Sequence, residues 1–230
     1  FESASRAKVT TEIVVAVDHP EMADEVDQFG GRWIMTGSAC PSGTDRIAEV
    51  AIQMPDVEVF VNVQADEPEI CPDVIDRVAS LLISDGNADM STAGTPIHDP
   101  SLLHDPACVK IVMGGMGEAD RAGQGRAIYF SRAPVPFVRD GINESHFKAE
   151  PPFFWHHIGL YAYRSDFLAW FAATPPGTLE QLEKLEQLRA VEAGKNILVT
   201  RIESATPGID TLQDLEAFES RFRANTQPSA

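Results

Sequence analysis

Residues 59–70 read V-F-V-N-V-Q-A-D-E-P-E-I, and this stretch decides the fold. Its first half is β-branched and aromatic, which is typical of a buried strand. The strand then ends in Gln64, Asp66 and Glu67, followed by Pro68 at a turn. A buried strand that delivers an amide and two carboxylates at its end indicates a site at the edge of a sheet. On position alone, Asp66 either holds a ligand or only caps the turn into Pro68.

Apolar strands alternate with amphipathic helices around this stretch. We expect strands at 13–17, 32–36 and 57–64, and helices that begin near Pro20, at a Thr44 cap and at Pro72. Because the strands are apolar on both faces, they predict a doubly wound α/β fold with a mostly parallel sheet and helices on both sides. Open parallel sheets bind ligands at the carboxyl ends of their strands, where Gln64 and Asp66 lie.

The middle of the chain has a different character. Strands at 109–113 and 127–131 flank a glycine-rich loop and predict a hairpin. Residues 134–152 are rich in proline, glycine and charge, so we expect them to lie outside the main sheet. A further strand is expected at 155–163.

Towards the C-terminus, Thr178 and Gln181 have the spacing of a capping box. One helix is expected after them, with the apolar stripe Leu179, Leu182, Leu185 and Leu188. The last strand is predicted at 196–202. A turn at 208–210 follows, and Thr211 with Asp214 predicts the cap of a final helix.

Composition limits the partners. The 230 residues can bury one large domain, and the net charge of −17 disfavours nucleic acid and anionic membranes as partners. No apolar run approaches the roughly 18 residues of a membrane helix, so membrane insertion is not expected. The three cysteines are odd in number and lack C-x-x-C spacing, which favours a reducing, cytoplasmic compartment over a disulfide or zinc framework.

Seven segments, in one order, carry a family resemblance: F-G-G-R-W-I-M-T (29–36), P-S-G-T-D-R-I-A-E-V (41–50), V-N-V-Q-A-D-E-P (61–68), A-I-Y-F-S-R-A-P-V-P (127–136), H-I-G-L-Y-A-Y-R (157–164), L-E-K-L-E-Q-L-R (182–189) and G-I-D-T-L-Q-D-L-E (208–216). Together they resemble the 3-deoxy-manno-octulosonate cytidylyltransferases, or CMP-Kdo synthetases. The resemblance runs from Ile13 to about Phe218. It implies one nucleotidyltransferase domain over 1–230, with a smaller lobe at 109–163.

The resemblance implies a reaction and a metal. The anomeric hydroxyl of Kdo would attack the α-phosphate of CTP, giving CMP-Kdo for lipopolysaccharide synthesis and releasing pyrophosphate. Catalysis in such a reaction is mainly positioning and charge neutralisation. Asp66 and Asp210 match the family's two Mg²⁺ ligands, which is how the turn at 208–210 gains a functional meaning.

The resemblance also places the sugar acid, through the family's contacting positions Gln64, Arg132, His157, Tyr161, Glu186 and Gln187. A guanidinium pairs with a carboxylate, and amide, imidazole and phenol groups bond hydroxyls. Taken alone, His157 also fits a satisfied core histidine, with His156 as a bystander. Glu186 lies in a run with Glu180, Glu183 and Glu192, and such a run is usually a solvated helix face.

Cytidine recognition is expected at Pro41, Ser42 and Gly43, with Arg46 reaching a phosphate or the base edge. Small residues let backbone groups approach a base and a ribose. From spacing alone, the same residues are an ordinary turn at the start of a helix.

Two departures from the family pattern matter. The family begins with a strand and a basic phosphate-binding loop, whereas this sequence begins F-E-S-A-S-R. We therefore expect an N-terminal piece to be absent and the chain alone to be inactive. The family glycine is replaced by Ala65, which costs roughly 1 kcal/mol if positive φ is needed and little if only close approach is needed.

Alternatives stay open at this point. The substrate could be another 2-keto acid sugar, such as 8-amino-Kdo or a sialic acid, or the protein could be a non-catalytic nucleotide-sugar-binding relative. The resemblance implies a homodimer through the smaller lobe, with the apolar cluster Phe130, Pro134, Val135, Pro136 and Phe137 as a candidate interface or, equally, a packed loop.

Overall fold

The computed structural model describes residues 1–114, 123–206, 208–209 and 211–226. Its elements follow in the order α1 (Glu2–Ser5), β1 (Val15–Val17), α2 (Pro20–Gln28), β2 (Trp33–Met35), α3 (Gly43–Gln53), β3 (Val59–Asn62), α4 (Pro72–Ser84), β4 (Met90–Pro96), α5 (Pro100–His104), β5 (Lys110–Gly114), β6 (Gln124–Ser131), α6 (Glu144–Phe147), β7 (Trp155–Arg164), α7 (Ser165–Ala173), α8 (Thr178–Glu183), α9 (Gln187–Glu192), β8 (Ile197–Arg201) and α10 (Leu212–Thr226).

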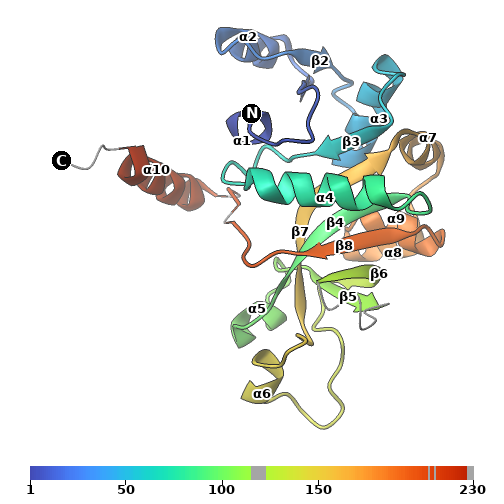
Figure 1. The fold of residues 1–230 in the computed structure, drawn as a ribbon, viewed down its shortest axis with the longest axis vertical. Helices are drawn as coiled ribbons and strands as arrows, with labels where there is room; N and C mark the ends of the chain where they lie inside the picture. The colour runs from blue at the N-terminus through green and yellow to red at the C-terminus, as the bar shows by residue number, and fades with distance from the viewer. Residues whose placement is uncertain (115–122, 207, 210, 227–230) are drawn as a thin grey trace.

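Two sheets carry the fold (Figure 1). The larger has the strand order β3-β7-β4-β8-β6-β5, and the smaller is the parallel pair β1–β2. The predicted α/β class is confirmed. Strand directions differ from the prediction, because β7 lies between β3 and β4 and runs antiparallel to both, while β4–β8 is the parallel pair among the described strands of the larger sheet. The sheet is therefore mixed rather than mostly parallel.

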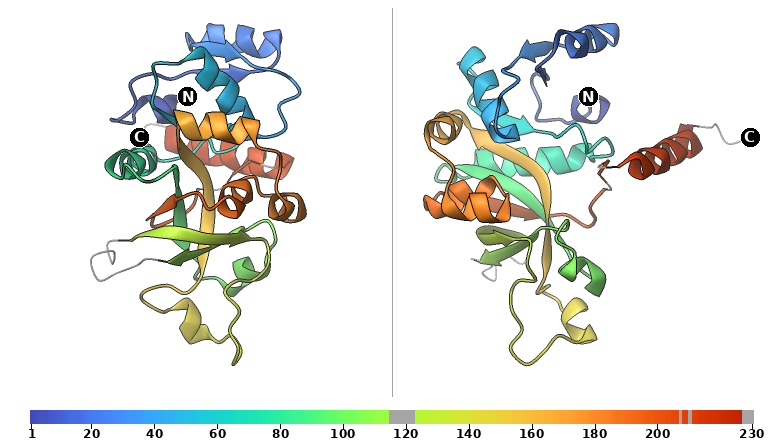
Figure 2. Two further views of the ribbon diagram at one scale, coloured as in Figure 1. Left: turned by 90° about the vertical axis from the view of Figure 1, so that its right-hand side faces the viewer. Right: turned by 180° about the vertical axis from the view of Figure 1, so that it is seen from behind.

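Helices cover both faces of the larger sheet, as predicted. Ile75, Val78 and Leu82 of α4 pack with Leu160 and Ala162 of β7 on one face. On the opposite face, α7, α8 and α9 bury the apolar cluster of Phe167, Leu168, Phe171, Leu185 and Leu188 against the sheet. The left view of Figure 2 shows the sheet between α4 and the pair α8–α9. Because side chains alternate along a strand, odd-numbered residues of β7 face α8–α9 and even-numbered residues face α4.

Strand β4 and the short helices α5 and α6 were not predicted. Strand β4 reads M-S-T-A-G-T-P, and its small residues give little hydrophobic signal although all seven positions are buried. The tertiary position in the middle of the sheet makes it a strand, which local propensity does not show. Helix α7 was also missed.

The helix expected after Thr178 is two short helices. Lys184 adopts the left-handed conformation, with φ of 55°, and ends α8. This break turns Leu182 outward, with 75% of its surface exposed, so the predicted leucine stripe is wrong at that position. The predicted capping box of Thr178 and Gln181 does not form; instead the Glu180 carboxylate accepts the Gly177 N–H at 3.1 Å, and Gly177 has no side chain to complete a box.

Helix starts elsewhere are close to the predictions. Pro20 and Pro72 stand in the first turns of α2 and α4. Ser42, and not Thr44, is the N-cap of α3: its side chain accepts the Asp45 backbone N–H. In this case the shorter hydroxyl side chain, two residues earlier, performs the capping.

The last helix stands away from the body of the molecule (Figure 1). Its predicted cap is confirmed, since the Thr211 N–H donates to Asp214 and the Asp214 N–H donates to the Thr211 hydroxyl, at 2.9 and 3.2 Å. An ion pair of 2.6 Å between Arg221 and Glu69 links α10 to the segment after β3. Among the described residues, no helix combines the length and hydrophobicity needed to cross a bilayer.

Candidate functional site

A row of side chains on β7 forms the floor of the candidate site. His157, Tyr161 and Tyr163 are all at odd positions and are all buried. The His157 and Tyr161 rings lie 5.3 Å apart, and Tyr161 stacks on Tyr163 at 5.6 Å. Phe130 of β6 closes the row with its edge on His157 at 4.9 Å. The resemblance therefore selected two members of one continuous surface, His157 and Tyr161.

The ring of His157 is neutral. Burial, with a smaller contribution from His156, lowers the pKa of His157 to about 3. Its Nε2 lies 3.1 Å from the hydroxyl of Thr92, and none of the described residues hydrogen-bonds to Nδ1. A core histidine with both nitrogens satisfied is thus not what the structure shows. His156 is half-buried, and burial also lowers its pKa.

Gln64 lies against the backbone of β7, at the residue midway in sequence between His157 and Tyr161. That residue is Gly159, and a Cβ there would stand 3.3 Å from the Gln64 Nε2. Glycine therefore permits the close approach of the amide to the strand. This contact joins the end of β3 to the floor formed by β7.

Asp66 lies in the exposed turn after β3, and its carboxylate makes no interaction with the rest of the described chain. Its backbone carbonyl accepts the Ile209 N–H at 2.8 Å, so the residue that precedes Asp210 in the sequence lies against Asp66. Asp210 itself is outside the described residues. Two carboxylates at this place suit Mg²⁺, which prefers oxygen ligands and bridges to substrate phosphates. Neighbouring Glu67 accepts a hydrogen bond from Thr206 at 3.2 Å.

The predicted nucleotide turn is joined to the predicted sugar-acid segment. The carboxylate of Glu186 accepts the Thr44 backbone N–H at 3.1 Å, in the first turn of α3. Thr44 also hydrogen-bonds to the Tyr163 phenol at 2.8 Å. Gly43 also lies beside Glu186, since a Cβ there would stand 3.8 Å from its Oε1. A carboxylate at this place is favourable because the amides of a helix N-terminus attract negative charge.

Arg46 lies apart from these residues. Its guanidinium donates to the Thr36 hydroxyl at 2.7 Å and to the Asp18 carboxylate at 2.8 Å. It therefore connects α3 to the carboxyl ends of β1 and β2. Its role at a phosphate stays a prediction.

Arg132 is held by backbone carbonyls. Its Nε and Nη1 donate to Glu183 O and Pro106 O, both at 2.8 Å, and its Nη2 is 3.4 Å from Lys184 O. In return, the Glu183 carboxylate accepts the Arg132 N–H at 2.9 Å and the Ser131 hydroxyl at 2.7 Å. Among the described residues, three of the five guanidinium N–H groups have acceptors, which leaves two for a ligand carboxylate.

The four glutamates of this run all accept hydrogen bonds from other parts of the chain. Glu180 forms hydrogen bonds of 2.6 and 2.8 Å with the buried guanidinium of Arg189. Glu192 accepts the Thr178 and Leu179 N–H groups of α8. With Glu183 on Arg132 and Glu186 on Thr44, the alternative of a merely solvated helix face does not hold for Glu180, Glu183 and Glu186, whereas Glu192 is exposed. The reason is tertiary: each carboxylate meets a donor from another part of the fold.

Gln187 is 4% exposed, and its Nε2 has no hydrogen-bond partner in the part of the chain that the structure describes. A buried amide donor without a partner costs free energy, roughly 1–3 kcal/mol. An acceptor group on a ligand would remove that cost. This unpaired donor therefore indicates that a ligand with a hydrogen-bond acceptor binds next to Gln187.

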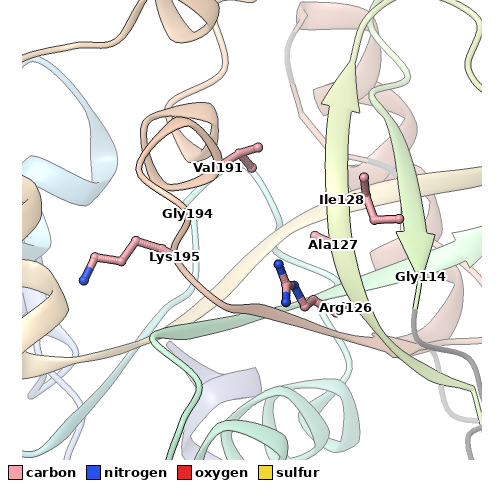
Figure 3. A pocket seen from close by; sticks show the side chains of 7 residues that line it. All are labelled: Gly114, Arg126, Ala127, Ile128, Val191, Gly194 and Lys195. Carbon is pink, nitrogen blue, oxygen red and sulfur yellow. The ribbon is translucent and has the colours of Figure 1, made fainter.

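The structure also shows residues that sequence reasoning missed: Thr44, Thr92, Tyr163 and Glu183. Their signals are weak, because single threonines and a glutamate in a charged run resemble many surface positions. A separate hollow of about 310 Å³ lies between β6 and the end of α9 (Figure 3). Its lining includes Arg126, Ile128 and Lys195 and none of the candidate residues.

Comparisons with known proteins assign the chain to a family. The family model described as cytidylyltransferase matches residues 1–197. A 3-deoxy-manno-octulosonate cytidylyltransferase of Rhodopirellula baltica is 53% identical over 97% of this chain and 86% of its own length. One of Leptospira interrogans is 43% identical over 97% of this chain and 83% of its own length.

A solved structure agrees with the sequence comparisons. It is described as CMP:2-keto-3-deoxy-manno-octonic acid synthetase complexed with CTP. It is 32% identical, covers 97% of this chain and 86% of its own chain, and has a TM-score of 0.85. The chain belongs to the cytidylyltransferase family and, within it, to the 3-deoxy-manno-octulosonate cytidylyltransferases.

Proposed function

We propose that this protein is a nucleotidyltransferase that transfers CMP from CTP to the anomeric hydroxyl of Kdo. The bond between the α-phosphorus and the bridging oxygen to the β-phosphate breaks, pyrophosphate leaves, and the hydroxyl proton passes to solvent. The observation that carries the proposal is the hydrogen bond between Glu186 and the Thr44 N–H. It brings the predicted sugar-acid segment against the predicted nucleotide turn, as direct transfer between two bound substrates requires.

The polar groups suit an acidic polyol. The two remaining N–H groups of Arg132 can pair with the carboxylate, while Gln64, His157, Tyr161 and Gln187 offer hydrogen bonds to hydroxyls. The unpaired Gln187 amide supports this assignment. Ser42 and Gly43 would hold cytidine, and Arg46 would serve a phosphate only by sharing or leaving Asp18.

Asp66 and Asp210 are the residues that would hold Mg²⁺. The ion supplies charge neutralisation at the triphosphate and lowers the pKa of a coordinated hydroxyl. The exposed, unengaged carboxylate of Asp66 fits that task. With a chain charge of −17, a cation is needed to bring a triphosphate to this edge of the sheet.

A homodimer through the lobe at 109–163 is part of the proposal. Phe137 is 86% exposed and Phe153 is 54% exposed, which supports an apolar contact surface there. Phe130 is fully buried in the core, so its predicted place in that surface is wrong. The cytoplasm is the proposed compartment, and the three free cysteines support it.

The test is a pyrophosphate-release assay on the natural full-length protein. CTP is compared with UTP and ATP, and Kdo with 8-amino-Kdo and sialic acid. We expect release only with CTP and Kdo together. Preference for another sugar acid would change the assigned substrate, and tight binding without release would indicate a non-catalytic relative.

A further inference from the structure

Thr92 stands at an irregularity in the sheet. The pairing of β4 with β7 shifts between Thr92 and Ala93, since Thr92 faces Tyr161 and Ala93 faces Ile158. Two residues of β7 are thereby left over as a bulge. The Thr92 side chain is fully buried, and its hydroxyl oxygen lies 3.1 Å from Ile158 O and 2.8 Å from Leu160 O. The same oxygen lies 3.1 Å from His157 Nε2.

Counting protons decides which group donates. A threonine hydroxyl has one proton and can accept through its lone pairs, whereas a backbone carbonyl only accepts. With two carbonyls in reach, the hydroxyl proton goes to a carbonyl, and the shorter distance favours Leu160. The hydroxyl oxygen must then accept from His157. A neutral imidazole carries one N–H, so Nδ1 is left as an acceptor.

We propose that Thr92 is a positioning residue that holds His157 as the Nε2–H tautomer and so presents Nδ1 as an acceptor for a hydroxyl group of the sugar acid. The substrate part of this inference rests on the proposed function, whereas the tautomer does not. The low pKa of His157 is consistent with it, because a ring that stays neutral keeps one nitrogen as an acceptor near neutral pH. Neither the sequence nor the resemblance singles out Thr92.

The first test reads the tautomer directly. The protein is labelled with ¹⁵N-histidine, and ring nitrogens are observed by two-dimensional NMR, which separates protonated from bare nitrogens. The chain has six histidines, and the signal of His157 is assigned by its loss in His157→Gln. We expect a protonated Nε2 and a bare Nδ1. A protonated Nδ1, or an even mixture, would overturn the inference without any assay of turnover.

The second test uses variants of Thr92. Thr92→Val keeps the shape and removes the hydroxyl, Thr92→Ser keeps the hydroxyl, and Thr95→Val is a matched control in the same buried strand. We expect Thr92→Val to mix the tautomers and to raise KM for Kdo about tenfold, as for one lost hydrogen bond, with KM for CTP unchanged. Thr92→Ser and Thr95→Val should behave like the natural protein.

Two results separate the inference from the proposed function. An inactive natural protein with the Nε2–H tautomer would contradict the function and leave the role of Thr92 on His157 standing. An active protein in which Thr92→Val keeps both the tautomer and KM for Kdo would contradict the inference alone. If Thr92→Val does not fold, the tautomer in the natural protein and in Thr92→Ser decides the question.

Discussion

The two sides of the candidate site differ in how much of their geometry the folded chain already provides. On the sugar side, the turn between α8 and α9 (residues 184–186) is held by Glu183 on Arg132, by Glu180 on Arg189 and by Glu186 on Thr44. On the metal side, the carboxylate of Asp66 is exposed, and only its backbone carbonyl contacts the Ile209 N–H.

This difference indicates which part of the site is arranged before a substrate binds and which part a ligand has to arrange. The three carboxylates near the proposed sugar position accept hydrogen bonds from internal donors, and the guanidinium of Arg132 lies among them to meet the carboxylate of a sugar acid. None of the described residues forms an ion pair with the Asp66 carboxylate, so a cation would be its natural partner. On the proposed function, the sugar side is preorganised, whereas the metal side would be completed by the ion and the triphosphate.

Removing the carboxylate of Asp66 should have the largest effect on turnover. For Asp66→Asn we expect kcat to fall about 10³-fold, because charge stabilisation at the phosphate is lost, with an unchanged melting temperature. The measurement is pyrophosphate release at saturating CTP and Kdo. Glu67→Gln, one residue away, is the control and should retain activity within about tenfold. Similar losses in both variants would contradict a special role for Asp66.

Breaking the internal support of the sugar side should instead cost stability. In Glu180→Ala, Arg189, which is 4% exposed, loses its bidentate partner. We expect the free energy of unfolding to fall by about 3 kcal/mol, since the buried guanidinium loses its hydrogen-bonded counter-ion and keeps only the longer ion pair with Asp45, at 3.8 Å. Denaturant titration measures it. Glu219→Ala removes an exposed ion pair with Arg223 on α10 and should cost less than about 1 kcal/mol. Equal costs would mean that the buried pair does not hold the turn.

Sequence reasoning reached the metal side more easily than the support of the sugar side. Gln64 and Asp66 stand at the end of an apolar run, and that local contrast is visible in any single sequence. His157 and Tyr161 came from family resemblance, because their common face depends on a bulged strand between two others. Gln187, at the start of α9, came from the same resemblance.

The supporting residues were missed for a physical reason. Glu180 and Glu183 look solvated until the fold brings Arg189 and Ser131 to them. Thr92 lies in S-T-A-G-T, a run of small residues whose strand is made by its neighbours in the sheet. Helix starts and strand ends are local events, whereas ion pairs, bulges and buried hydroxyls are properties of the assembled sheet.

The smallest predicted effect concerns Gly159, at the contact between Gln64 and strand β7. A Cβ at residue 159 would lie 3.3 Å from the Gln64 Nε2, so Gly159→Ala should push the amide aside by a few tenths of an ångström. We expect KM for Kdo to rise about three- to tenfold, as for a weakened hydrogen bond, with KM for CTP and the melting temperature nearly unchanged. Gly86→Ala, where a Cβ meets nothing within 4 Å, is the control. If KM for CTP rises instead, Gln64 contacts the nucleotide and not the sugar acid, and its assignment to the sugar side is wrong.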